Sequence, residues 1–91
     1  PLDFLSGKYI AAISGIARPE SFEEKLNALG VNLEITKRFA DHHRFTDREL
    51  VEFNRCVRRD LDLIVTTEKD WAKLHALPGM RAGPLPIWRI E

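Results

Sequence analysis

This 91-residue sequence has a single cysteine, no net charge and no long apolar run. Cys56 cannot form an internal disulfide, which fits a reducing compartment, and we expect a buried helix residue without chemistry of its own. Fourteen basic residues balance fourteen acidic ones, so no overall field draws the chain to nucleic acid or to an anionic membrane surface. No apolar stretch approaches the roughly 20 residues that span a bilayer, and no signal-peptide pattern opens the chain.

What remains is the composition of an ordinary globular protein, with 44% hydrophobic and 31% charged residues. A chain of this length makes one domain with a packed core and little stability to spare. Because it starts at Pro1 without an initiator methionine and ends inside an apparent strand, we expect residues 1–91 to be a single domain taken from a longer protein.

Hydrophobic patterning predicts four strands. Nearly unbroken apolar runs at 8–14 and 63–65 are typical of strands that are covered on both faces. Alternation of apolar and polar residues over 31–36 indicates an edge strand with one exposed face. The last strand, 85–90, contains Pro86, which cannot donate to a ladder and therefore also favours an edge position.

Helix start signals separate these strands. Pro19 is suited to the first position of one helix. Thr46 and Glu49 form a capping box that begins a second helix of about four turns. Thr67 predicts the cap of a short third helix. Residues 1–7, which precede the first strand, are interpreted as a linker.

Strands and helices in strict alternation, joined by right-handed crossovers, predict a small three-layer Rossmann-like α/β domain. Its sheet has four mostly parallel strands in the order 2-1-3-4, with helices on both faces. The direction of winding reverses between the first and third strands, so we expect the binding crevice at their carboxyl ends. This topology brings the polar segments 15–18, 41–44 and 66–70 to one edge of the sheet.

Two histidines next to an acid make the segment Asp41-His42-His43 the richest in chemistry. An imidazole beside a carboxylate can be held in one tautomer and act as a base, or it can donate a neutral nitrogen to a metal. Neighbouring residues of an extended chain point to opposite sides, so we expect only one histidine to face the crevice. A structural or solvent-exposed role for the segment is the alternative.

Lys69 and Arg18 lie near predicted helix N-termini, where they could hold a phosphate alongside free backbone N–H groups. The alternative is that both are solvated surface charges. Thr67 joins them as a candidate cofactor-binding residue, although its hydroxyl is also the expected helix cap. Glu68 and Asp70 are interpreted as first-turn acids that favour the helix dipole, and no metal site is predicted.

Four short motifs occur in an order and spacing that are specific when taken together. They are Ser14-Gly15-Ile16-Ala17-Arg18-Pro19 followed by Phe22 and Leu26, Leu29-Gly30, Phe39-Ala40-Asp41-His42-His43, and Thr66-Thr67-Glu68-Lys69-Asp70 followed by Lys73. With these motifs the chain resembles the carboxyl-terminal region of tetraacyldisaccharide 4'-kinase, the lipid A kinase of Gram-negative bacteria. The resemblance extends from about residue 7 to residue 77.

The resemblance implies phosphorylation of the 4'-hydroxyl of a lipid A precursor, tetraacyldisaccharide 1-phosphate, with ATP and Mg²⁺ at the cytoplasmic face of the inner membrane. It implies that His42 is catalytic and pairs with a base Asp of an amino-terminal P-loop domain, while Asp41 orients or flanks it. No G-x-x-x-x-G-K-[ST] phosphate loop occurs in this chain. We therefore expect the carboxyl-terminal lobe of a two-domain kinase, inactive by itself and without a tightly bound cofactor. Its partners are the P-loop domain, the lipid precursor and, through the missing part, the membrane surface.

Two other functions stay open from the sequence. A stand-alone α/β module could bind a nucleotide or a phosphate in the same crevice without catalysis. A metal-dependent phosphoesterase is the other, because Asp-His-His also occurs as a metal motif. That chemistry usually needs several further ligands at other strand ends, where only Glu68 and Asp70 are available.

Overall fold

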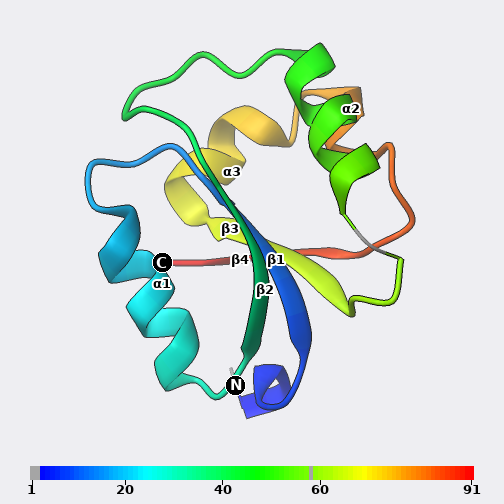
Figure 1. Cartoon of the computed structure of the whole chain (residues 1–91). Coiled ribbons are helices and arrows are strands. Elements are labelled where there is room, and N and C mark those ends of the chain that lie inside the picture. The colour runs from blue at the N-terminus through cyan, green and yellow to red at the C-terminus, as the bar shows by residue number, and fades with distance from the viewer. Residues whose placement is uncertain (1–2, 58) are drawn as a thin grey trace.

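The computed structural model describes residues 3–57 and 59–91. A sheet of four strands in the order β2-β1-β3-β4 forms its centre (Figure 1). The strands are β1 (Tyr9–Ser14), β2 (Asn32–Arg38), β3 (Leu63–Thr67) and β4 (Ile87–Ile90). All three strand pairings are parallel, which confirms the α/β fold and the strand order that the sequence predicts.

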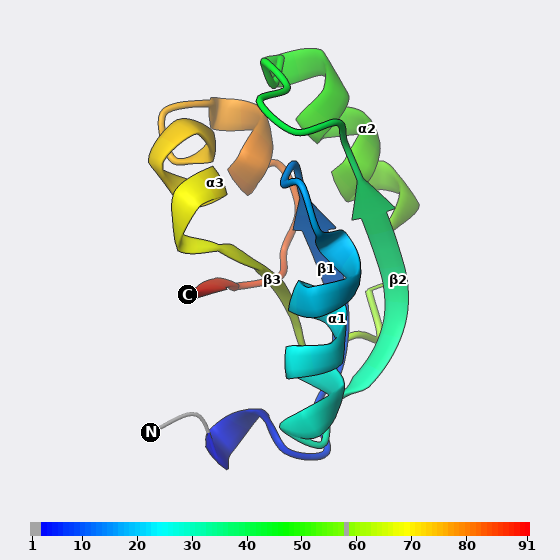
Figure 2. The same ribbon diagram turned by 90° about the vertical axis from the view of Figure 1, so that its left-hand side faces the viewer.

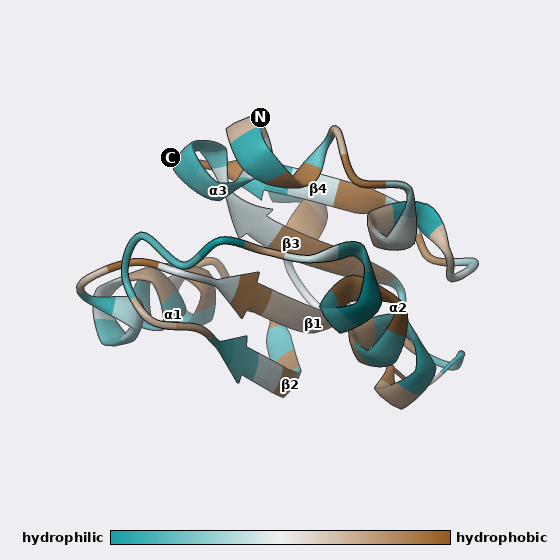
Figure 3. Ribbon diagram, turned by 90° about the horizontal axis from the view of Figure 1, so that it is seen from above, coloured by the Kyte–Doolittle hydropathy of each residue, from teal (hydrophilic) through white to brown (hydrophobic). Residues whose placement is uncertain are grey.

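In the described part of the chain, three α-helices and two short 3₁₀ helices surround the sheet. They are α1 (Pro19–Ala28), α2 (Asp47–Cys56) and α3 (Glu68–Leu74), with η1 (Asp3–Leu5) and η2 (Pro78–Arg81). Seen from above, α1 and α2 lie on opposite sides of the sheet, and the central strands are its most apolar part (Figure 3). Within the described residues, no helix is both long enough and apolar enough to cross a bilayer.

Each face of the sheet has its own hydrophobic core. Successive residues of a strand point to opposite faces, so β1 and β3 supply apolar side chains to both. The core under α1 consists of Leu5, Ile10, Ala12, Phe22, Leu26, Val31, Leu63, Val65 and Ile90. The core under α2 and α3 consists of Ala11, Ile13, Leu50, Phe53, Val57, Leu61, Ile64, Leu74 and Met80. The predicted helices on both faces are therefore confirmed.

The helices begin where local chemistry predicts. Pro19 occupies the first turn of α1, and Thr46 forms the complete capping box with Glu49 at the start of α2. The predicted length of α2 is wrong, because its C-cap Val57 adopts extended backbone directly after Cys56. The prediction that Cys56 is buried is also wrong. At the end of this shorter helix Val57 turns into the core, and Cys56 is left exposed.

The amino-terminal segment is not the linker that the sequence suggests. Leu5 of η1 is fully buried in the core under α1. Gly7 N donates to Gly30 O at 2.8 Å, which fastens η1 to the turn between α1 and β2. Residues 1–2 of the expected linker lie outside the described residues.

A second unpredicted element, η2, packs on α2. Asn54 Nδ2 donates to the carbonyls of Gly79 at 2.8 Å and Met80 at 3.2 Å, while Gly79 N donates to Asp47 Oδ1. Met80 is fully buried in the core under α2 and α3. These contacts join residues far apart in sequence, so no local pattern predicts them.

Candidate functional site

Three segments meet beyond the carboxyl ends of the central strands, as the topology predicts. The connection from β2 to α2 passes over the same end of the sheet as the turn from β1 to α1 (Figure 2). Phe39 N donates to Ser14 O at 2.7 Å, which joins these two connections. The first turn of α3 completes the group, because Asp70 contacts Gly15 and Lys69 contacts Asp41.

His42 is exposed in this group, with 80% of its side chain accessible. Its backbone has φ +61°, and it is the one non-glycine residue with positive φ among those described. Such a conformation costs about 1–2 kcal/mol and is found preferentially at functional sites. Local sequence preference does not offset this cost, so contacts on either side of His42 must stabilise its left-handed backbone.

Asp41 provides the first of these contacts. Lys69 Nζ donates to Asp41 Oδ1 at 3.1 Å, and the other carboxylate oxygen lies 3.6 Å from His42 Nε2. The hydrogen bond from Lys69 holds the pKa of the Asp41 carboxyl below its usual range, and the neighbouring His42 acts in the same direction. Asp41 therefore remains ionised beside the imidazole at neutral pH.

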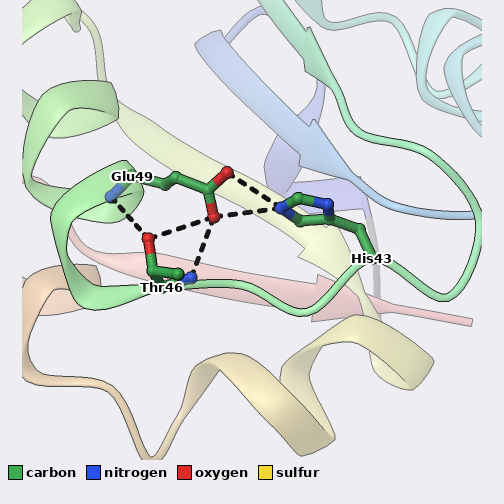
Figure 4. A network of polar contacts seen from close by, with 3 residues as sticks. All are labelled: His43, Thr46 and Glu49. Atoms are coloured by element: carbon green, nitrogen blue, oxygen red, sulfur yellow. Dashed lines mark hydrogen bonds and ion pairs between the residues drawn. The ribbon is translucent and has the colours of Figure 1, made fainter.

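His43 provides the second contact (Figure 4). Its Nε2 lies 3.0 and 2.9 Å from the two carboxylate oxygens of Glu49. Because a carboxylate only accepts, the contact assigns a proton to Nε2, which donates to Glu49. The ring also stacks on Phe39, with centroids 4.7 Å apart, and meets the edge of Phe45 at 5.3 Å. His43 is thus an anchor of the loop, and His42 is the exposed histidine.

Glu49 links this anchor to the start of α2. Its Oε1 accepts from Thr46 N at 2.9 Å, so one carboxylate serves both the capping box and His43. The hydrogen bond from His43 is the largest cause that lowers the pKa of the Glu49 carboxyl, followed by the bond from the Thr46 backbone. The capping box is readable in the sequence, but its extension to His43 is not.

The structure gives the other predicted site residues different surroundings. Lys69 is engaged with Asp41. The Thr67 hydroxyl accepts from Asp70 N at 3.0 Å and donates to Asp70 Oδ2 at 2.8 Å, so a cofactor would have to share it. Arg18 is exposed at the N-cap of α1, where its side chain makes no capping hydrogen bond. Cofactor binding by these three residues stays a prediction.

The phosphoesterase alternative needs several metal ligands close together in space. Within 3–57 and 59–91, no three or more His, Cys, Asp or Glu side chains are grouped so that they could hold a metal ion. The sequence also has no phosphate loop. The described residues thus offer no grouped ligand set for the phosphoesterase alternative. Glu68, one of the two candidate ligands, is instead paired with Arg89 Nε at 2.9 Å.

Asp70 is the functional candidate that the sequence does not reveal. It lies in the first turn of α3, as expected of a residue that favours the helix dipole. However, it is fully buried, and its Oδ2 accepts from Gly15 N at 2.9 Å as well as from Thr67 Oγ1. The spacing Thr67-x-x-Asp70 signals the cap, whereas the bond to Gly15 spans 55 positions and has no local signal.

Comparison with known proteins gives one consistent result. The family described as tetraacyldisaccharide-1-P 4'-kinase matches residues 2–90. Tetraacyldisaccharide 4'-kinase of Anaeromyxobacter dehalogenans strain 2CP-1 is 43% identical over 96 residues, covering 99% of this chain and 24% of that protein. The kinase of the same name from Bradyrhizobium diazoefficiens is 39% identical over 83 residues, covering 91% of this chain and 25% of that protein.

The chain thus spans about a quarter of the length of the curated relatives that it matches. No solved structure matches it significantly. The family match covers nearly every residue, including all three segments that meet at the carboxyl ends of the strands. The chain therefore belongs to the tetraacyldisaccharide 4'-kinase family.

Proposed function

We propose that this chain is the carboxyl-terminal lobe of a two-domain kinase that transfers a phosphoryl group from ATP to the 4'-hydroxyl of tetraacyldisaccharide 1-phosphate, a lipid A precursor. The family match over residues 2–90 and the names of the relatives support this assignment. An amino-terminal P-loop domain, in the larger part of the protein, supplies the phosphate loop that this chain does not contain. The lobe by itself is inactive and binds no nucleotide tightly.

The observation that carries the proposal is the way in which His42 is presented. A side chain that completes a site on another domain must be exposed before the domains close and must already be in place. His42 is exposed, while Asp41 on one side and His43 on the other are held by Lys69 and Glu49. The loop therefore has fixed flanks and one exposed imidazole.

Phosphoryl transfer depends mainly on positioning and electrostatic stabilisation, which suits a lobe that contributes a single group. In the closed enzyme, His42 orients a carboxylate base of the P-loop domain, and Asp41 orients the His42 ring. Lys69 keeps Asp41 in place and ionised. The full protein acts at the cytoplasmic face of the inner membrane, where its larger part contacts the lipid surface.

The test is His42→Ala in the full-length kinase, assayed with Mg-ATP and the lipid precursor. A general acid–base or base-orienting group contributes about 10²–10⁴-fold, so kcat/KM should fall by about that factor. His75→Ala is the matched control, because His75 is an exposed histidine at the end of α3 whose ring contacts Trp71 of the same helix. The His75 variant should keep its activity, and both variants should unfold at the same temperature as the parent. Unchanged kcat/KM for His42→Ala would refute the role of His42.

A further inference from the structure

Asp70 has an arrangement that stability alone does not explain. Its carboxylate is fully buried, and Oδ1 has no hydrogen-bond partner among the described residues. A buried carboxylate with an unpaired oxygen costs folding free energy, and an apolar residue of similar size would often be at least as stable. The cap of α3 does not need this side chain, because the Asp70 backbone N–H donates to Thr67. The carboxylate also accepts from Thr67 Oγ1 at the same helix start, so its contact outside this turn must account for its burial.

That contact is with Gly15, the first residue after β1. Asp70 Oδ2 accepts from Gly15 N at 2.9 Å in a buried setting. Gly15 in turn lies against the loop that carries His42. A Cβ placed on Gly15 would be 2.9 Å from Phe45 Cζ and 3.4 Å from Ala40 O, which flank the Asp41-His42-His43 segment on both sides. The position of Gly15 therefore sets where this loop can rest.

The neighbour of Asp70 holds the same loop from outside, since Lys69 Nζ bonds Asp41 Oδ1 at 3.1 Å. We infer that Asp70 is a positioning residue for His42, acting through Gly15 and Phe45, while Lys69 acts directly on Asp41. This inference rests on the proposed function, because it assigns Asp70 a role in the reaction that His42 serves. The first turn of α3 thus places the exposed imidazole from two directions.

A positioning role predicts that Asp70 and His42 act as a unit. In the full-length kinase, Asp70→Ala should lower kcat by about 10- to 100-fold with little change in the KM for Mg-ATP, the size of effect expected from a misplacement of about 1 Å. Asp70→Asn should recover most of the rate, because its amide oxygen can still accept from Gly15 N. In a His42→Ala background, Asp70→Ala should cost less than about threefold more, since there is no imidazole left to place.

Thr66→Val is the matched control. The Thr66 hydroxyl is also fully buried and donates to Ile13 O at 2.8 Å, a bond between β3 and β1 that spans 53 positions. It lies within the sheet and not under the loop, so its loss should lower the midpoint of unfolding without lowering kcat more than about threefold.

If Asp70→Ala fails to fold, Gly15→Ala is the second variant, because it displaces Phe45 while Asp70 is intact. Gly15→Ala must then lower kcat in the parent, but have little further effect in the His42→Ala background.

The outcomes separate the two proposals. Suppose that His42→Ala lowers kcat/KM, and that Asp70→Ala lowers the rate of the His42→Ala variant by the same factor as it lowers the rate of the parent. The positioning role is then refuted and the proposed function stands. The positioning role is equally refuted if Asp70→Ala and Thr66→Val lower kcat alike. If His42→Ala leaves kcat/KM unchanged, the role of His42 fails and that of Asp70 fails with it.

Discussion

Replacement of Gly15 by alanine probes the contact on which the loop rests. Gly15 is not in the left-handed region, so alanine is compatible with its backbone and the effect is one of space. The new Cβ would stand 2.9 Å from Phe45 Cζ, whereas ordinary contact begins at 3.4 Å, so the ring must withdraw by at least about 0.5 Å. Phe45 packs against the stacked rings of Phe39 and His43, with ring centroids 5.1 and 5.3 Å away, and these rings limit how far it can withdraw.

Overpacking of this kind costs about 1–3 kcal/mol. A loss of about 2 kcal/mol should lower the melting temperature of a domain of this size by about 8–16 °C. Thermal and urea unfolding of the 91-residue chain, followed by circular dichroism, measures both quantities. The second substitution Phe45→Leu should restore part of the loss in the Gly15→Ala variant, because it removes the ring that the new methyl group meets.

Gly7→Ala is the comparison variant. Gly7 has φ +80°, and no atom lies within 4 Å of the place that a methyl group would take, so alanine there strains the backbone without any clash. The cost of about 1–2 kcal/mol at Gly7 should be independent of Phe45→Leu. The reasoning is refuted if Gly15→Ala is as stable as the parent, or if Phe45→Leu affects the Gly7 and Gly15 variants equally.

Two further predictions concern the start of α2 and its acid sensitivity. Thr46→Ala removes the hydroxyl that accepts from Glu49 N at 3.2 Å, and it should cost about 1 kcal/mol, seen as a melting temperature lower by about 4–8 °C. The pKa values of Glu49 and Asp41 are lower in the folded than in the unfolded state, so both carboxylates stabilise the fold when they are ionised. This contribution is complete above the unfolded-state pKa values of about 4 and is lost as the pH falls through the folded-state pKa values. The urea concentration at the midpoint of unfolding should therefore be constant near neutral pH and should decrease once the pH is below about 4. For Glu49→Gln this decrease should be less steep, and equal slopes for parent and variant would contradict this assignment.

The parts of the fold that follow from the sequence are those whose signals are local. The two central strands are predictable because burial on both faces requires an apolar run, as at Ile10–Ile13. The start of α2 is predictable because both halves of its capping box lie within four residues. By contrast, η1 and η2 exist because Leu5 and Met80 pack into cores made by distant elements. Nothing next to those residues in the sequence indicates the contact.

The site divides in the same way. Topology brings the three polar segments to one edge, since the carboxyl ends of parallel strands face the same side. It does not decide which histidine is exposed. That choice depends on the pairing of His43 with Glu49, and Glu49 is already expected to serve Thr46. The sequence pattern identifies the cap but not the second use of the same carboxylate.

The exposed histidine is thus defined by what holds its neighbours. A left-handed backbone at His42 costs about 1–2 kcal/mol, and the side chain itself makes little contact that could offset it. The stabilisation comes from His43 on Glu49, from Asp41 on Lys69 and from the ring of Phe45 on Gly15. Each of these contacts joins the loop to a different element of the fold. Because Glu49, Lys69 and Gly15 act on the neighbours of His42, substitutions there should move the imidazole, and the role proposed for His42 requires that the imidazole be held in place in this way.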